Sequence, residues 1–314
     1  MNGHPQGSPI DVLLAALAEA PFRLAPERQE ELQRLIADRN INFQFDVQTH
    51  EMRFEGAELF GGIGLVYIGQ RGLERLWAHT YGVIHVYRRF QATGFTQPML
   101  LSSTEEGRIT GLLLDWAIDG EVNGNPASWP VDLPRPEANP EDDQGKLTNE
   151  LFLGLVGFAV LHEIGHIVRQ HQGDGLPKDV KYRHEFEADE WAYDWVMEHW
   201  REYIPNIPQI QPGDPLIFKK RCTLITGLFS LIAIHHVRQP RNVETSGHPH
   251  TIDRLLRFLI KHANENNGLD SGLAWALAST AINMHLSQFS TGAWPDLDDF
   301  RDHLNEVRLR YPRL

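Results

Sequence analysis

The sequence predicts an α+β fold that is predominantly α-helical, with a small β-hairpin or sheet near the N-terminus. Apolar residues recur at helical spacing over most of the 314 residues. One early stretch, residues 41–56, instead alternates apolar and polar residues, as strands do. Hydrophobic residues make up 41% of the chain and charged residues 23%, an ordinary globular composition that can supply a sizeable core.

The first part of the chain is expected to hold two helices and a hairpin. A short apolar helix is expected over residues 9–20 and an amphipathic one over 26–38. The segments INFQFDVQ and EMRFEG then read as two strands joined at Thr49–His50. Glycines cluster directly afterwards, which favours a loop or a close backbone approach: Gly61, Gly62 and Gly64.

Two helices and a long connection come next. Residues 71–90 form an aromatic-rich helix, on which His79 and His85 are expected to be packing or surface residues rather than metal ligands. A second helix is expected over residues 105–119. The stretch 120–145 is rich in Pro, Asn and Asp, which indicates a surface loop or a lid over a cleft.

The second half is expected to be helical and to be organised around residues 147–172. Gly173–Gly175 and Pro177 end that helix, and a second one follows over residues 182–203. The short joint predicts that the two are antiparallel neighbours. Further helices are expected at 218–237, 251–263, 271–289 and 297–310, with a polar loop at 239–247. We therefore expect an N-terminal helical and hairpin region, 1–145, packed on a helical core, 146–314, as one compact unit.

Composition narrows the classes of partner and of site. A net charge of −13 makes nucleic acid or an anionic membrane surface an unfavourable partner. The one cysteine, Cys222, excludes a disulfide framework and a cysteine-based zinc site, and its apolar surroundings indicate a buried structural thiol. No basic signal peptide is evident, and no uninterrupted apolar run reaches the ~20 residues that span a bilayer. These features favour a cytoplasmic protein.

The central helix carries the pattern H-E-x-x-H as His162, Glu163 and His166. Positions 162 and 166 lie one turn apart on one face, so two imidazoles can reach one zinc ion. Glu163 is rotated by about 100° from His162 and points beside the metal. There it can take a proton from a water molecule that the metal activates.

The following helix offers a third ligand on its buried face. Glu185 and Asp189 are four residues apart and share an apolar stripe, where paired carboxylates are costly unless they meet a metal or a partner. One zinc ion held by His162, His166 and Glu185 resolves this, and leaves a fourth position for water. Asp189 is then placed to accept the free N–H of a ligand histidine. Weaker alternatives for the third ligand are His184 and Glu190, whereas Glu187 lies about 200° away from Glu185.

These motifs resemble those of the gluzincin metallopeptidases, which pair H-E-x-x-H with a downstream E-x-x-A-D-x-x-A, here Glu185 to Ala192. The segment SGHPHTIDR looks like the H-P-x-x-x-x-R element of the HtpX and CAAX-prenyl-protease class, with His248, Pro249 and Arg254. The resemblance implies a zincin-like core in which His248 contacts the substrate or the developing oxyanion. Arg254 would then hold the segment or a substrate group.

Chain length and motif position are most like those of the Lit-type phage-exclusion peptidases, although the motifs cover only residues ~150–255 and the first 145 residues carry no signature. The resemblance implies a zinc-dependent endopeptidase that cuts one intracellular protein, a host translation elongation factor in phage exclusion. Glu163 would be the general base and His248 the first candidate for the oxyanion donor. The other candidate donors are Tyr182, Tyr193 and His250, each of which is more simply explained as structural.

Two other functions remain open on the sequence. One is a regulatory protease of the ImmA kind, which cleaves a repressor. The other is a zinc-stabilised binding module that captures a partner without cutting it. An intact Glu163 argues against the binding module, because a purely structural zinc site does not use a base.

Overall fold

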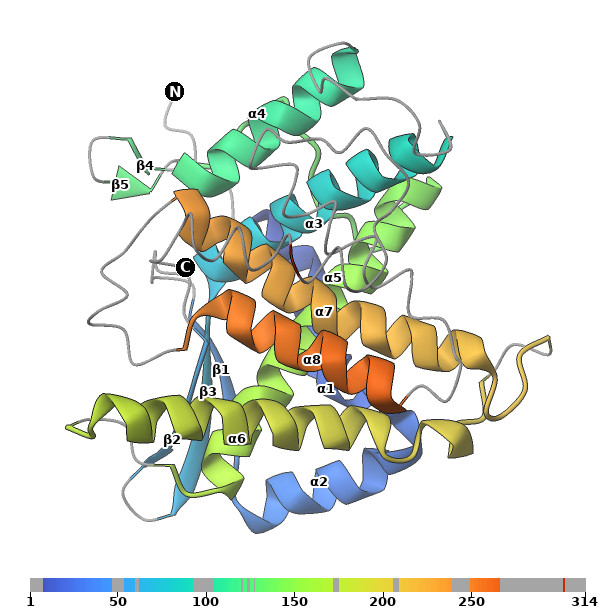
Figure 1. Cartoon of the computed structure of the whole chain (residues 1–314). Helices are drawn as coiled ribbons and strands as arrows, with labels where there is room; N and C mark the ends of the chain where they lie inside the picture. Colours follow the sequence, from blue (N-terminus) through green and yellow to red (C-terminus); the bar gives the residue numbers. More distant parts are fainter. Residues whose placement is uncertain are drawn as a thin grey trace.

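The computed structural model places the chain around one long helix (Figure 1). The residues that it describes are 8–46, 54–59, 62–92, 104–119, 121–122, 125–126, 128–171, 175–205, 209–238, 249–265 and 302. The predicted loop 239–247 and the predicted helices 271–289 and 297–310 lie outside them, apart from the single residue 302. The predicted fold class, α+β and mainly helical, is confirmed: the described helices accompany one three-stranded sheet.

The chain begins with two helices, each entered through a 3-10 turn. The 3-10 helix η1 (Pro9–Leu13) leads into α1 (Leu14–Leu24), and η2 (Pro26–Arg28) leads into α2 (Gln29–Asp38). Ser8 caps the first turn by accepting a hydrogen bond from the Ile10 amide at 3.2 Å. Helix α1 continues through Pro21 beyond the predicted end at residue 20, and it packs against the central helix α5.

The sheet contains both predicted strands, but the predicted hairpin is wrong. Strands β1 (Asn42–Asp46) and β2 (Phe54–Leu59) do not pair with each other. Strand β3 (Ile63–Gly69) lies between them, parallel to β1 and antiparallel to β2. The hairpin is therefore β2–β3, turned at Gly62 with φ of +75°. The expected turn at Thr49–His50 falls outside the described residues.

Strand β3 was missed because its glycines indicated a loop. Gly64 instead allows a close approach: a Cβ atom there would lie 2.8 Å from the Ile41 side chain and 3.2 Å from that of Ile167. The glycine thus lets the sheet lie directly on helix α5.

Helices α3 (Gln70–Ala92) and α4 (Glu105–Asp119) pack together, and two-residue strands β4 (Glu121–Val122) and β5 (Asn125–Pro126) follow. In the proline-rich connection, Trp129 is buried against Trp116, with ring centroids 4.5 Å apart. Asn149, near the start of α5, donates a hydrogen bond to the Glu137 carbonyl at 2.7 Å. Asn149 and His162 are 13 positions apart on α5, which corresponds to about 20 Å along the helix. This hydrogen bond therefore holds the connection at a distance from His162. The role of the connection as a lid stays a prediction.

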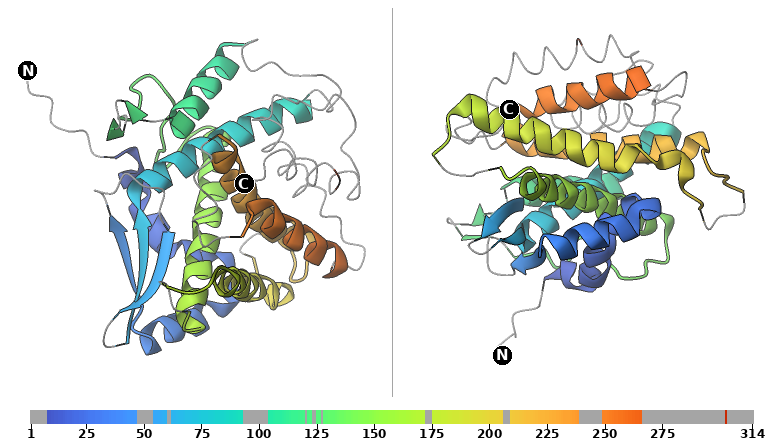
Figure 2. Two further views of the ribbon diagram at one scale, coloured as in Figure 1. Left: turned by 60° about the vertical axis from the view of Figure 1, so that its left-hand side comes forward. Right: turned by 90° about the horizontal axis from the view of Figure 1, so that it is seen from below.

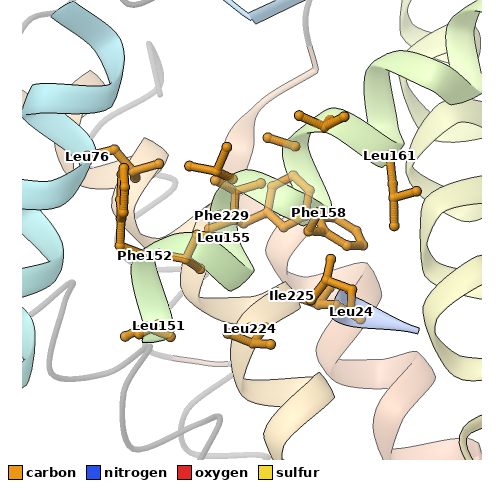
Figure 3. Packing of buried hydrophobic residues seen from close by; sticks show 14 of the residues in the cluster. Leu24, Leu76, Leu151, Phe152, Leu155, Phe158, Leu161, Leu224, Ile225 and Phe229 are labelled. Atoms are coloured by element: carbon orange, nitrogen blue, oxygen red, sulfur yellow. The ribbon is translucent and has the colours of Figure 1, made fainter. Parts of the chain in front are cut away.

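Helix α5 (Asp143–Val168) is the central element, with the sheet on one side and α7 (Pro215–Arg238) and α8 (Thr251–Glu265) on the other (Figure 2). It is long and apolar enough to cross a membrane by composition, but 78% of its most apolar window is buried inside the fold, as in a core helix. Figure 3 shows why: Phe152, Leu155 and Phe158 of α5 point into a cluster with Ile225 and Phe229 of α7. Helices α1 and α3 of the N-terminal region also pack on α5.

Helix α6 (Lys178–Met197), followed by the short η4 (Trp200–Glu202), runs across α5. In the left view of Figure 2, α5 stands upright while α6 is seen end-on, so the predicted antiparallel pair is wrong. The helices cross where Gly165 faces Ala188. They are so close there that a Cβ atom on residue 165 would lie only 3.2 Å from the Ala188 backbone. Gln170 (φ 59°) and Gly175 (φ +77°) redirect the chain between them. The crossing brings the histidine face of one helix onto the carboxylate face of the other.

Candidate metal centre

His162 and His166 meet on one face of α5, as their spacing predicted. Their Nε2 atoms lie 3.1 Å apart. The His162 side chain is buried and that of His166 is partly buried. The neighbouring apolar residues Leu161, Ile164 and Ile167 are buried in the core and hold the helix that presents the two imidazoles.

Glu185 of α6 faces both imidazoles. Its Oε2 lies 3.5 Å from His162 Nε2 and its Oε1 lies 3.5 Å from His166 Nε2. Tetrahedral zinc with ligand distances of about 2.0–2.2 Å needs donor atoms roughly 3.3–3.6 Å apart. The distances from Glu185 to the two imidazoles fall in this range through different oxygens, and the distance between the imidazole nitrogens is slightly shorter. One donor atom from each side chain lies within 4.8 Å of the others, and the three residues form the one such group of His, Cys, Asp and Glu residues in the described part of the chain.

Asp189 and Arg254 form a buried shell behind this cluster. Asp189 Oδ1 lies 2.9 Å from His162 Nδ1, the ring nitrogen that faces away from Glu185. Arg254 of α8 donates two hydrogen bonds to Asp189, from Nε at 2.8 Å and from Nη2 at 2.6 Å. Its Nη1 lies 3.4 Å from Glu185 Oε2, and its guanidinium lies over the Phe229 ring at 4.7 Å. One guanidinium thus supports both acidic residues.

Glu163 is held by strand β2. The Gly56 amide donates a hydrogen bond to Glu163 Oε2 at 2.6 Å. A Cβ atom on residue 56 would lie 2.3 Å from the Glu163 backbone oxygen, so only glycine permits this contact. Gly56 faces Val66 in the register with β3, and its amide points away from β3 toward the helix. One feature of the sequence could have indicated this role: Gly56 is an isolated glycine inside a strand pattern.

Comparison with known proteins places this site in a family. The peptidase U49 family model matches residues 66–278, which is more than half of the chain. The matched range includes every residue of the candidate site except Gly56. The chain belongs to the peptidase U49 family. A relative, the cell death peptidase of Escherichia coli (strain K12), is 25% identical over 211 residues, which are 64% of this chain and 68% of that protein. No solved structure matches.

Burial and neighbouring charges shift the pKa values in this U49 peptidase in opposite directions. Burial lowers the pKa of His162, but Asp189 and Glu185 outweigh burial and raise it to about 10. Burial and the charge of His162 lower the pKa of His166 to about 3. Burial raises the pKa of Asp189, but Arg254 and His162 outweigh it and the net shift is downward. The two neighbouring imidazoles therefore differ in how readily each takes up a proton.

The other candidate residues of α6 are not part of the metal cluster, as the choice of Glu185 implied. His184 stacks on His171 with ring centroids 4.1 Å apart, and Glu190 forms an exposed pair with Arg257 at 3.4 Å, so neither reaches the metal cluster. Glu187, which was set aside by its angle on the helix, does reach the site indirectly. It lies 3.0 Å from His171 Nε2, and His171 in turn contacts His166.

Among the described residues, no candidate oxyanion donor has a recorded contact with the metal cluster. His248 lies outside them. His250 Nδ1 accepts a hydrogen bond from the Ile252 amide at 3.2 Å and so caps α8, and the Tyr182 ring lies beside Lys178. Tyr193 points into the core, where its hydroxyl lies 3.2 Å from His262 Nδ1.

The residues expected to be structural lie in the core. Cys222 is fully buried, as predicted, and its Sγ also lies 3.2 Å from His262 Nδ1. His79 is buried on α3 and takes no part in the metal cluster.

Proposed function

We propose that this U49 peptidase is a zinc-dependent endopeptidase whose metal is held by His162, His166 and Glu185. The observation that carries the proposal is the cluster of His162, His166 and Glu185, with one donor atom from each within 4.8 Å of the others, beside a glutamate that is not part of the set. A structural zinc site has four protein ligands, whereas a catalytic site has three and keeps one position open. Three ligands together with Glu163 fit the catalytic kind, and they argue against a binding module.

The chain's own residues supply the rest of the chemistry. Zinc, when bound, polarises the scissile carbonyl and lowers the pKa of the attacking water to about 7. Glu163 takes the proton of that water and passes it to the leaving amine. The Gly56 amide keeps the Glu163 carboxylate at the edge of β2, and Asp189 fixes His162 with Nε2 free to bind the metal.

His248 remains the first candidate for stabilising the oxyanion, since it belongs to the H-P-x-x-x-x-R element whose arginine, Arg254, contacts Glu185. Arg254 is not proposed to hold a substrate group. Its side chain is buried and its guanidinium is engaged by Asp189 and Glu185.

We propose a specific intracellular protein as the substrate. The support is the relative's name, cell death peptidase, since cleavage of one essential protein is enough to stop growth. A translation elongation factor, cut in the cytoplasm during phage exclusion, is the candidate that the sequence resemblance suggests. A repressor is the alternative substrate.

The test is expression of the wild-type protein and of Glu163→Gln in bacteria, followed by mapping of new protein termini. The wild type is expected to create a new terminus in one host protein, and Glu163→Gln is expected to create none while it retains zinc, because glutamine cannot accept the proton. His162→Ala is expected to lose zinc. Full activity in Glu163→Gln, or retained zinc in His162→Ala, contradicts the proposal. Cleavage of a repressor instead of an elongation factor would change the substrate and leave the mechanism standing.

A further inference from the structure

His171 lies just beyond the end of α5 and folds back onto it. The helix ends at Val168, and Gln170 adopts a left-handed conformation with φ of 59°. The His171 amide donates a hydrogen bond to the His166 carbonyl at 3.0 Å. This turn brings the His171 Nδ1 atom to 2.9 Å from Nδ1 of His166, the ring nitrogen that faces away from Glu185.

Helix α6 holds the His171 ring from two sides. Nε2 of His171 lies 3.0 Å from Glu187 Oε2, and the His184 ring stacks on His171 with an interplanar angle of 2°. The His171 side chain is only 5% exposed, whereas that of Glu187 is 41% exposed. The row Glu187–His171–His166 therefore runs from the surface to the metal cluster.

One arrangement of protons satisfies both contacts when a metal is bound. Nε2 of His166 must then be unprotonated, so its proton sits on Nδ1 and is donated to His171 Nδ1. His171 consequently carries its own proton on Nε2 and donates it to the Glu187 carboxylate. Each nitrogen and the carboxylate oxygen has a defined role, and no second tautomer of His171 fits both neighbours.

We propose that His171 and Glu187 are positioning residues that fix the tautomer and the ring orientation of His166. They would do for His166 what Asp189 does for His162, with the imidazole of His171 between the ligand and the Glu187 carboxylate. The inference rests on the metal site proposed above. Loss of such a partner weakens metal binding by roughly 10–100-fold.

The test measures zinc affinity of the full-length protein by competition with a chelator. His171→Phe keeps a ring to stack on His184 but accepts no hydrogen bond, and it is expected to bind zinc about 10–100-fold more weakly. His171→Asn keeps an acceptor near the Nδ1 position, and Glu187→Gln keeps one for Nε2–H, so both are expected to retain most of the affinity. Glu187→Leu is expected to lose affinity. His184→Phe is the matched control, since it preserves the stacking and changes no contact in the row.

The outcomes separate the two proposals. If the wild type binds zinc and His171→Phe binds it as tightly, the positioning role is wrong while the metal site stands. If the wild type binds no zinc, both are wrong. A variant that fails to fold does not decide the question, so nitrogen-15 NMR of the zinc-loaded wild type accompanies the titration. The expected spectrum has the His171 proton on Nε2, and a proton on Nδ1 overturns the inference.

Discussion

The buried pair Arg254–Asp189 connects stability to the metal site. Asp189 is 1% exposed and contacts both Arg254 and His162. The spacing of Glu185 and Asp189 on one helix face was enough to predict that Asp189 would lie next to a ligand histidine. Arg254 comes from a helix more than 60 residues later, so only the folded chain shows which acid it pairs with. A buried charge left without its partner is strongly destabilising.

Arg254→Met is therefore expected to lower the free energy of unfolding by about 3–5 kcal/mol, because it removes the guanidinium that pairs with the buried carboxylates of Asp189 and Glu185. Urea unfolding monitored by circular dichroism gives this quantity. Arg257→Met is the matched control on the same helix, since its exposed pair with Glu190 contributes at most about 1 kcal/mol. An equal loss of unfolding free energy in the two variants would contradict the stabilising role of the buried Arg254–Asp189 pair.

At the scale of elements, the packing of β2 on α5 decides where Glu163 lies. Gly56→Ala places a Cβ against a backbone oxygen that cannot move without the helix. The strand must shift instead, and the hydrogen bond to Glu163 lengthens. We expect kcat to fall by about 10²-fold, which is the effect of misplacing a catalytic group by roughly 1 Å, with zinc retained.

Two glycine variants control for this experiment. Gly64→Ala disturbs the same sheet–helix contact, but it meets the side chains of Ile41 and Ile167, which can adjust, and it lies away from the Glu163 carboxylate. Gly111→Ala on α4 meets nothing within 4 Å. Both are expected to keep kcat near the wild-type value. A Gly56→Ala protein with unchanged kcat would show that the strand does not position Glu163.

Helices could be predicted from the sequence because their apolar periodicity is local, and α4 has its predicted bounds. The order of the strands in the sheet could not be predicted, because strand pairing depends on contacts between residues that are distant in the sequence. Gly64 is typical of a loop in the sequence, whereas in the structure it makes room for the Ile167 side chain of α5. The crossing of α5 and α6 was also missed, because it depends on the left-handed residue Gln170 and on the contact of Gly165 with Ala188. His171 was missed for the same reason.

At the scale of the molecule, α5 shares its core with helices from both halves of the chain. Helices α1 and α3 pack on it from the N-terminal half and α7 from the C-terminal half. The division at residue 145 stays a prediction. Helices α6, α7 and α8 also meet at a buried polar group, in which His262 Nδ1 lies 3.2 Å from Tyr193 Oη and 3.2 Å from Cys222 Sγ.

This group makes stability depend on pH. Burial, followed by the charge of Lys261, lowers the pKa of His262 to about 3 in the folded protein, while the unfolded chain has a value near 6.5. Between these values the unfolded state binds the additional proton, so stability is lost as pH falls through that window, by up to about 1.4 kcal/mol per pH unit. His262→Gln keeps a hydrogen-bonding side chain without titrating, and its unfolding free energy is expected to fall less steeply. Identical pH profiles for the two proteins would contradict the burial of a neutral His262.

The metal assignment is tested most directly by anomalous diffraction from zinc-loaded crystals, collected on either side of the zinc absorption edge. We expect one peak per chain, about 2.0–2.2 Å from Nε2 of His162, Nε2 of His166 and a carboxylate oxygen of Glu185, with Glu163 beside the ion and not bound to it. A crystal that shows zinc elsewhere, or none at these three side chains, would contradict the proposed catalytic centre.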